Sequence, residues 1–179
     1  MPWRCRALKD RDGESLKGYQ IDAEGLAQTT DGRFWVSFEA DHRVWGYNSI
    51  DGPASVSLPR PPDFPRLQNN SSLEALARDA KDALYAIPER SGRLDRPFPV
   101  YRFANGAWSR FGSIRRAPPF LVVGAEFGPD GWLYVLERDF KTFAGFRTRI
   151  RRFRVLNGGF GAEETLLETG FARLDNMEG

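Results

Sequence analysis

The stretch that decides the fold runs from Asp22-Ala-Glu-Gly-Leu-Ala27 through the turn Asp31-Gly32 to Phe34-Trp-Val-Ser-Phe-Glu39. The same order of segments returns fifty positions later as Ser72-Leu-Glu-Ala-Leu-Ala77 and Ala83-Leu-Tyr-Ala-Ile-Pro-Glu89. An apolar segment, a turn and a strand of aromatic and β-branched residues therefore recur together. Recurrence at a fixed period of this length indicates a repeat architecture.

Two more units follow the first two. The third contains Asp130-Gly131 and then Trp132-Leu-Tyr-Val-Leu-Glu-Arg138, and it is a looser copy, because its Asp-Gly register places Val123 opposite Glu24. The next unit begins at Asp175-Asn-Met-Glu-Gly179, where the chain stops. Within the whole range 1–179, the units are delimited at about 20–68, 69–120 and 121–174, with a further unit starting at 175.

Each unit has the length and turn signals for four short strands. The third strand is expected at Val44-Trp-Gly-Tyr47, Val100-Tyr-Arg-Phe103 and Ile150-Arg-Arg-Phe-Arg-Val155. Four short strands every ~50 residues are typical of the blades of a β-propeller. The sequence thus predicts an all-β chain of about three four-stranded blades. Three blades do not close a ring, so we expect either a piece of a longer protein or self-association of two copies.

Composition excludes several classes of function. The net charge is only +2, so nothing favours a nucleic-acid partner. No run of residues approaches the roughly 18 apolar positions that a membrane span needs. The single cysteine, Cys5, provides neither an internal disulfide nor a cysteine metal site. Charged residues at 9–12 interrupt the position where a signal peptide would be apolar, so no export signal is visible.

Several segments, taken in order, resemble one known family. They include Asn69-Asn-Ser-Ser-Leu-Glu-Ala-Leu-Ala77, Leu133-Tyr-Val-Leu-Glu-Arg-Asp-Phe140 and Asp175-Asn-Met-Glu-Gly179. The ordered set is similar to the motifs of the phytase-like family, which carries the label "esterase-like activity of phytase". One departure is Asn70-Ser71-Ser72-Leu73, where the family usually carries a glycine. The resemblance implies a ring of six or seven blades in an exported bacterial protein, periplasmic or secreted, that hydrolyses phosphoesters or esters; with no signal in this chain, the cytoplasm stays open.

Acidic residues recur at repeated positions, and they are the main candidates for chemistry. The candidates are Glu24, Glu39, Glu74, Glu89, Glu137 and Glu178, together with Asp22 and Asp175. Equivalent residues of successive blades converge near the axis of a propeller, and gathered carboxylates repel one another unless a cation or an arginine lies between them. Oxygen ligands of this kind suit Ca²⁺ first and Mg²⁺ second, and either cation can polarise a phosphate.

The residues divide into three sets of candidate roles. The metal ligands are Asp22, Glu24, Glu74 and Glu178. The catalytic candidates are Glu24, Glu74 and Glu178, followed by Glu39, Glu89, Glu137 and Arg138. His42, Arg43 and Arg149 are candidates for binding a small anionic or ester substrate. The alternative is structural: each glutamate would cap its own blade, pairing with an adjacent arginine as in Glu89-Arg90 and Glu137-Arg138.

The arginine-rich strand and the only histidine have plain alternatives as well. Arg147, Arg149 and Arg151 share one face of a strand, which suits either an anionic substrate or a solvated face paired with glutamates. His42 is the only histidine and no Gly-x-Ser-x-Gly turn is present, so a serine-nucleophile mechanism has little support. Two functions follow: a metal-assisted hydrolase of phosphoesters or esters, or a non-catalytic propeller that binds a ligand or partner protein.

Overall fold

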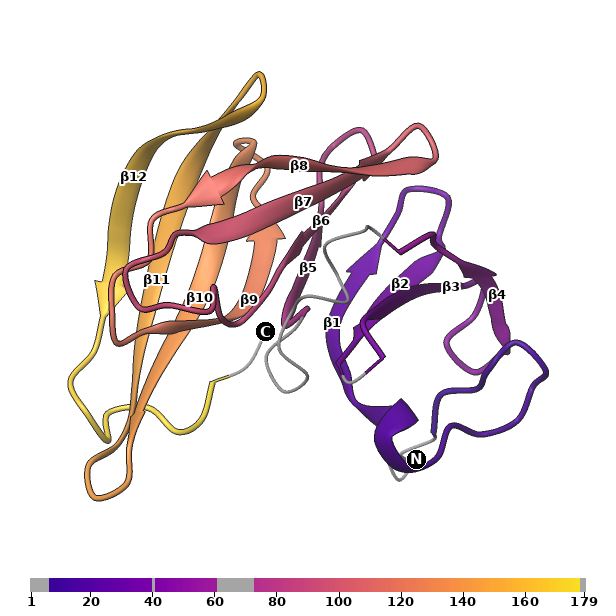
Figure 1. The fold of residues 1–179 in the computed structure, drawn as a ribbon, viewed down its shortest axis with the longest axis horizontal. Helices are drawn as coiled ribbons and strands as arrows, with labels where there is room; N and C mark the ends of the chain where they lie inside the picture. The colour runs from indigo at the N-terminus through magenta and orange to yellow at the C-terminus, as the bar shows by residue number, and fades with distance from the viewer. Residues whose placement is uncertain (1–6, 40, 61–72, 178–179) are drawn as a thin grey trace.

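Antiparallel strands make up nearly all of the regular structure in the computed structural model, which describes residues 7–39, 41–60 and 73–177. The strands form three four-stranded sheets, and within each sheet they follow the order of the sequence (Figure 1). One short 3-10 helix, η1 (Gly18–Ile21), precedes them. In this described part of the chain no helix is long and apolar enough to cross a membrane. Consecutive four-stranded antiparallel sheets are propeller blades, so the all-β prediction is confirmed.

The twelve strands divide equally among the three blades. Blade 1 contains β1 (Ala23–Gln28), β2 (Phe34–Phe38), β3 (Arg43–Tyr47) and β4 (Ala54–Ser57). Blade 2 contains β5 (Ala75–Arg78), β6 (Leu84–Ile87), β7 (Phe98–Ala104) and β8 (Ala107–Ile114). Blade 3 contains β9 (Leu121–Phe127), β10 (Trp132–Lys141), β11 (Gly145–Leu156) and β12 (Gly159–Glu168).

The blades pack face to face, and the first strand of each lies beside the first strand of the next. Strand β5 contacts both β1 and β9. The apolar core accordingly lies between sheets: one buried cluster joins Leu76 and Leu84 of blade 2 to Trp35 of blade 1, and another joins Ile87 to Val135 of blade 3. Burial of these large side chains between blades is the main favourable term in their association.

The turns between the first two strands of each blade keep the repeat even where the sequence departs from it. Gly32 and Gly131 have φ angles of +85° and +76°, the left-handed conformation that favours glycine. Blade 2 has Asp82 at this turn, with φ of +60°. Aspartate is one of the few other residues that tolerates this conformation, so the turn survives without the Asp-Gly pair.

These turns define two ends of the blades. We call the end with the turns 29–33, 79–83 and 128–131 the hairpin end. The opposite end, where β1 and β5 begin and β2 and β6 finish, is called the carboxylate end, because Glu24, Glu39, Glu74 and Glu89 lie there. The first strands run between the two ends, so a site at one end is separated from a site at the other.

Candidate functional site

Three carboxylates of blade 1 converge at the carboxylate end. Pairing of Ala23 with Phe38 places Asp22, just before β1, next to Glu39, just after β2. The Glu39 amide donates a hydrogen bond of 2.9 Å to the Asp22 carbonyl oxygen, which fixes this arrangement. One carboxylate oxygen each from Asp22, Glu24 and Glu39 lies within 4.8 Å of the others. Such a set of oxygens suits a hard divalent cation.

A β-bulge sets the direction of Glu24. The register of β1 against β2 shifts between Ala23 and Gly25, leaving Glu24 as the extra residue. A bulge of this kind re-aims a side chain relative to a regular strand. The third blade has the same irregularity at its equivalent position, between Leu136 and Glu137 of β10, opposite Val123. Val123 is buried, so blade 3 has an apolar residue where blade 1 has a carboxylate.

Close approach of β1 to β5 brings Glu74 of blade 2 to the same place. A Cβ on Gly25 would lie 2.7 Å from the Leu76 amide nitrogen, so only glycine permits this spacing. The Ser37 hydroxyl donates a hydrogen bond of 2.8 Å to the carbonyl oxygen of Leu73, the residue before Glu74. These two contacts fix the first strand of blade 2 against blade 1, with Glu74 beside the blade 1 carboxylates.

Glu74 shows that these charges interact. Burial, followed by the charges of Glu24, Glu89 and Glu39, raises the pKa of Glu74 from 4.5 to about 8, and Arg138 opposes the rise. A carboxyl group whose pKa lies this high holds a proton at neutral pH. Around Glu74, the neighbouring negative charges therefore outweigh the opposing charge of Arg138.

Arg138 replaces a glutamate in the third blade. Counted from the Asp-Gly turn, Glu39 of blade 1 corresponds to Arg138, and blade 2 has Glu89 at that position. The Arg138 guanidinium donates a hydrogen bond to the side-chain oxygen of Asn176 and lies 5.6 Å from the centre of the Phe146 ring. Blade 3 thus contributes a cation where the first two blades contribute carboxylates.

Glu89 has two cationic neighbours. Arg90 donates a hydrogen bond of 3.1 Å to the Glu89 carboxylate, which confirms the adjacent pair that the sequence suggested. The pKa of Arg116 is lowered, first by burial and then by the charge of Arg90, and the charge of Glu89 opposes this shift only in part. The Arg116 guanidinium also donates hydrogen bonds of 3.2 Å to the Ser91 hydroxyl and to the Arg93 carbonyl. Arg116 was missed by sequence reasoning, because it comes from the loop before β9 and belongs to no repeated position.

Glu137 lies in a different environment from the other repeated glutamates. Its side chain has no exposed surface and pairs with Arg149 at 2.8 Å and with Arg151, which is also completely buried. The Arg151 Nε donates a bond of 2.7 Å to the same carboxylate, and its Nη1 lies 2.8 Å from Glu163. Burial alone would lower the pKa of Arg151. The hydrogen bonds and charges of Glu137 and Glu163 together outweigh burial, so the pKa of Arg151 is raised.

This network corrects two details of the sequence analysis. The partners of Glu137 lie across the blade, whereas the sequence suggested the adjacent Arg138, and the reason is that neighbouring strand residues point to opposite faces. Arg149 and Arg151 share one face as expected, but that face is buried rather than solvated. The Arg149 guanidinium stacks 3.9 Å from the centre of the Phe120 ring. The register that pairs Glu137 with Arg149 follows from the hairpin turn between β10 and β11, a signal that the repeat-based reasoning did not use.

The substrate-binding candidates of blade 1 are enclosed. Arg43 is 2% exposed. Its guanidinium lies 4.0 Å from the ring centre of Phe38 and 4.4 Å from that of Trp45. It also donates a hydrogen bond of 2.7 Å to the Gln20 carbonyl oxygen. His42 is buried as well, with a φ of +23°. Both side chains therefore contribute to the packing of blade 1.

Of the two acidic candidates near the end of the chain, the structure describes only Asp175. Asp175 is exposed and accepts a hydrogen bond of 2.8 Å from the Asn176 amide. Glu178, the third of the leading catalytic and metal candidates, lies outside the described residues. The structure therefore brings Glu24, Glu39, Glu74 and Asp22 together and places Glu137 and Arg149 inside blade 3.

The chain belongs to the Phytase-like family, described as "Esterase-like activity of phytase", because the sequence model of that family matches residues 4–179. This match covers nearly the whole chain and confirms the resemblance seen in the motifs. Comparison with curated proteins finds no significant match.

Solved structures similar to this chain include virginiamycin B lyase from Staphylococcus aureus. It is 14% identical with a TM-score of 0.46, and the alignment covers 84% of this chain and 57% of that one. A protein of unknown function from Dyadobacter fermentans is 15% identical with a TM-score of 0.44, covering 87% of this chain and 45% of that one. The chain thus spans about half the length of these structures. The assignment of a propeller fold rests on the three four-stranded sheets of this chain and not on these similarities.

Proposed function

We propose that the chain is part of a phytase-like propeller that hydrolyses phosphoesters or esters with the help of a divalent cation at the carboxylate end. The observation that supports this most is the convergence of oxygens from Asp22, Glu24 and Glu39 within 4.8 Å. The Glu74 carboxyl group, with its pKa raised to about 8, lies beside them. Two blades thus supply acidic groups to one place, as a site for a cation and a substrate requires.

The residues fit a hard cation by the type of their ligand atoms. Carboxylate oxygens are the ligands that Ca²⁺ prefers, with Mg²⁺ as the second choice. We assign Asp22, Glu24 and Glu39 as the ligands, so that Glu39 joins the metal set, with Glu74 next to them. When bound, the cation would offset the excess negative charge and polarise the phosphoryl or carbonyl oxygen of the substrate.

Glu74 is proposed to move a proton in this reaction. A bound cation would lower the pKa of Glu74 from about 8, and a group whose pKa stays close to the working pH is an effective general acid or base. Arg138 is a candidate for contacting the anionic part of the substrate, because its charge acts on Glu74 from blade 3. Glu137 and Arg149 are instead assigned a structural role within blade 3.

The test is a hydrolysis assay on the full-length gene product with 4-nitrophenyl phosphate and 4-nitrophenyl butyrate, with added Ca²⁺ or after chelation. Glu24→Gln and Glu74→Gln are each expected to reduce the rate by roughly 100-fold or more, the usual scale of an acid–base contribution. The matched control is Glu164→Gln, which removes an exposed carboxylate paired with Arg152. Full activity in both site variants would exclude this site.

The same preparation separates the enzyme from the non-catalytic alternative. If Ca²⁺ binds at the carboxylate end but neither substrate is hydrolysed in any condition, the propeller binds a ligand or partner through this end without turnover. Hydrolysis that is lost on chelation and restored by Ca²⁺ supports the metal-assisted reaction.

A further inference from the structure

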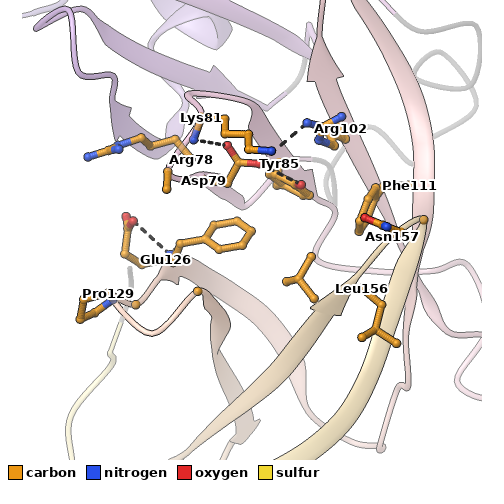
Figure 2. Close-up of a pocket in the computed structure, with 16 residues that line it drawn as sticks. Arg78, Asp79, Lys81, Tyr85, Arg102, Phe111, Glu126, Pro129, Leu156 and Asn157 are labelled. Atoms are coloured by element: carbon orange, nitrogen blue, oxygen red, sulfur yellow. Dashed lines mark hydrogen bonds and ion pairs between the residues drawn. The ribbon is translucent and has the colours of Figure 1, made fainter.

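A second concave region lies at the hairpin end, between blades 2 and 3. This pocket has a volume of about 810 Å³ and is formed by the turns after β5, β9 and β11 (Figure 2). Its size falls within the range of small-molecule sites. Strand β5 separates it from the carboxylate end, since Glu74 precedes the strand and Arg78 ends it; four strand residues span roughly 13 Å. The pocket is therefore not part of the site described above.

The floor of the pocket is aromatic. Tyr85 is buried, with its ring centre 5.3 Å from that of Phe111 and 4.9 Å from that of Phe127. The first pair is close to perpendicular, at 83°. Leu156 from the third blade adds an aliphatic wall (Figure 2). A flat apolar ligand could pack against these side chains and displace water from them.

Positive charge lies above this floor. Arg78, Lys81 and Arg102 all line the pocket (Figure 2). The Arg102 guanidinium lies 5.7 Å from the centre of the Tyr85 ring, and its Nε is buried without a hydrogen-bond partner in the described part of the chain. An unsatisfied buried donor of a cation is costly, and an anionic group in the pocket would satisfy it.

The acidic residues of the pocket are already engaged by the protein. The Asp79 carboxylate accepts hydrogen bonds of 2.9 Å from the Lys81 amide, 3.0 Å from the Ala83 amide and 3.2 Å from the Tyr85 hydroxyl. The Glu126 carboxylate accepts a bond of 3.1 Å from the next amide in the chain. Two of the cations also have acidic neighbours, since Arg102 lies 3.9 Å from the Asp79 carboxylate and Arg78 lies 3.6 Å from that of Asp82. Because the Asp79 carboxylate is already shared among two amides and the Tyr85 hydroxyl, it compensates Arg102 only in part, and the exposed Lys81 adds a further positive charge to the pocket.

We propose that this pocket binds a small aromatic anion, with its ring on the Tyr85 floor and its carboxylate, or another anionic group, on Arg102 and Lys81. The aromatic floor explains the preference for a flat ring, and the unsatisfied Arg102 donor explains the preference for an anion. The role is additional to hydrolysis at the carboxylate end, because the two sites share no residue.

The experiment uses 2-naphthoate as the probe and the uncharged 2-naphthalenemethanol as its matched analogue, with binding measured by ligand-observed NMR titration. We expect a dissociation constant of roughly 1 mM or tighter for 2-naphthoate, the scale that an aromatic ligand of this size can reach. The alcohol is expected to bind about tenfold more weakly, because it loses the charge-assisted contact.

Variants locate the binding. Arg102→Gln is expected to weaken 2-naphthoate binding roughly tenfold, and Lys81→Gln, at an exposed side chain, roughly two- to fivefold. Arg110→Gln is the control, since Arg110 is an exposed arginine of the same blade that does not line the pocket. Thermal unfolding shows whether Arg102→Gln still folds, and Lys81→Gln gives the answer if it does not.

Three results with the ligands and the pocket variants would overturn the proposal, and a fourth comes from the other end of the blades. They are the absence of 2-naphthoate binding at millimolar concentration, equal binding of the acid and the alcohol, and equal weakening by Lys81→Gln and Arg110→Gln. Weakening by Glu24→Gln would also contradict it, because that change lies at the other end of the blades. Loss of hydrolysis in Glu24→Gln with naphthoate binding unchanged would support both sites independently.

Discussion

Equivalent ends of blades 1 and 3 carry glutamates in opposite surroundings. In blade 3, Glu137 is fully buried and two arginines enclose it at hydrogen-bond distance. At the ends of blades 1 and 2, carboxylates face one another, and their charges, after burial, raise the pKa of Glu74 to about 8. Glu137 lies one place before the repeat position of Glu39 and Glu89 and corresponds to the buried Phe38. It therefore points to the other face of its strand, where the arginines of β11 enclose it. A repeated glutamate is structural where arginines balance it and a candidate for chemistry where they do not.

Removing the carboxylate of blade 3 should have the largest effect on stability. Glu137→Gln removes the buried carboxylate that Arg149 and Arg151 share and leaves them only the more exposed carboxylates at the edge of the blade. We therefore expect a loss of about 3 to 5 kcal/mol in the free energy of unfolding. Urea denaturation at pH 7 measures it. The control is Glu164→Gln on the exposed face of the same blade, with an expected change below about 1 kcal/mol. Equal effects of the two substitutions would mean that the buried network is not what holds blade 3.

The opposite result is expected for a carboxylate of blade 2. The folded state binds the Glu74 proton more tightly than the unfolded chain does. The free energy of unfolding is therefore unaffected by this group below pH 4.5, and it falls as the pH rises towards about 8. Glu74→Gln should therefore leave stability unchanged near pH 4. At pH 9 it should raise stability by about 1 to 2 kcal/mol, a figure reduced for partial solvent screening.

Denaturation curves of wild type and Glu74→Gln at a series of pH values provide the measurement. The two curves should separate between pH 4.5 and pH 8 and run parallel above that range. A variant less stable than the wild type at pH 9 would show that Glu74 is paired, as Glu137 is.

Smaller shifts are expected from changing the neighbours of Glu74. Among charges, Glu24 contributes most to raising the pKa of Glu74, and Arg138 is the weakest of the contributors, with opposite sign. Glu24→Gln should therefore lower the pKa of Glu74, and Arg138→Gln should raise it by less. Titration of the Glu74 carboxyl carbon by NMR in each variant checks the two signs. Shifts in the same direction would mean that the substitutions change the packing rather than the charge.

The fold followed from the sequence because each blade carries its own local signals. The strand segments and the turns at Asp31-Gly32 and Asp130-Gly131 repeat at a fixed period, and glycine is what those turns require. Blade 2 was predicted in spite of lacking this pair, and the segments expected at 72–77 and 83–89 contain most of β5 and all of β6. Asp82 shows why the repeat survives there, because its side chain tolerates the same turn conformation.

The site followed only in part, because it depends on contacts that no repeat position encodes. The period predicted that Glu24 and Glu74 would lie close together, and the charge interaction between them agrees with this. The bulge that re-aims Glu24 depends on strand register, and register is set by the fold as a whole. The partners of Glu137 come from across a long hairpin, and Arg116 comes from a loop, so neither was visible in the repeat.

The most direct test of the contrast between the blades is the protonation of Glu74 itself, followed through its carboxyl carbon by NMR from pH 3 to pH 10 with and without Ca²⁺. We expect a midpoint near pH 8 without the cation and a lower midpoint with it, because a bound cation favours the ionised form. A midpoint near 4.5 that Ca²⁺ does not move would contradict it.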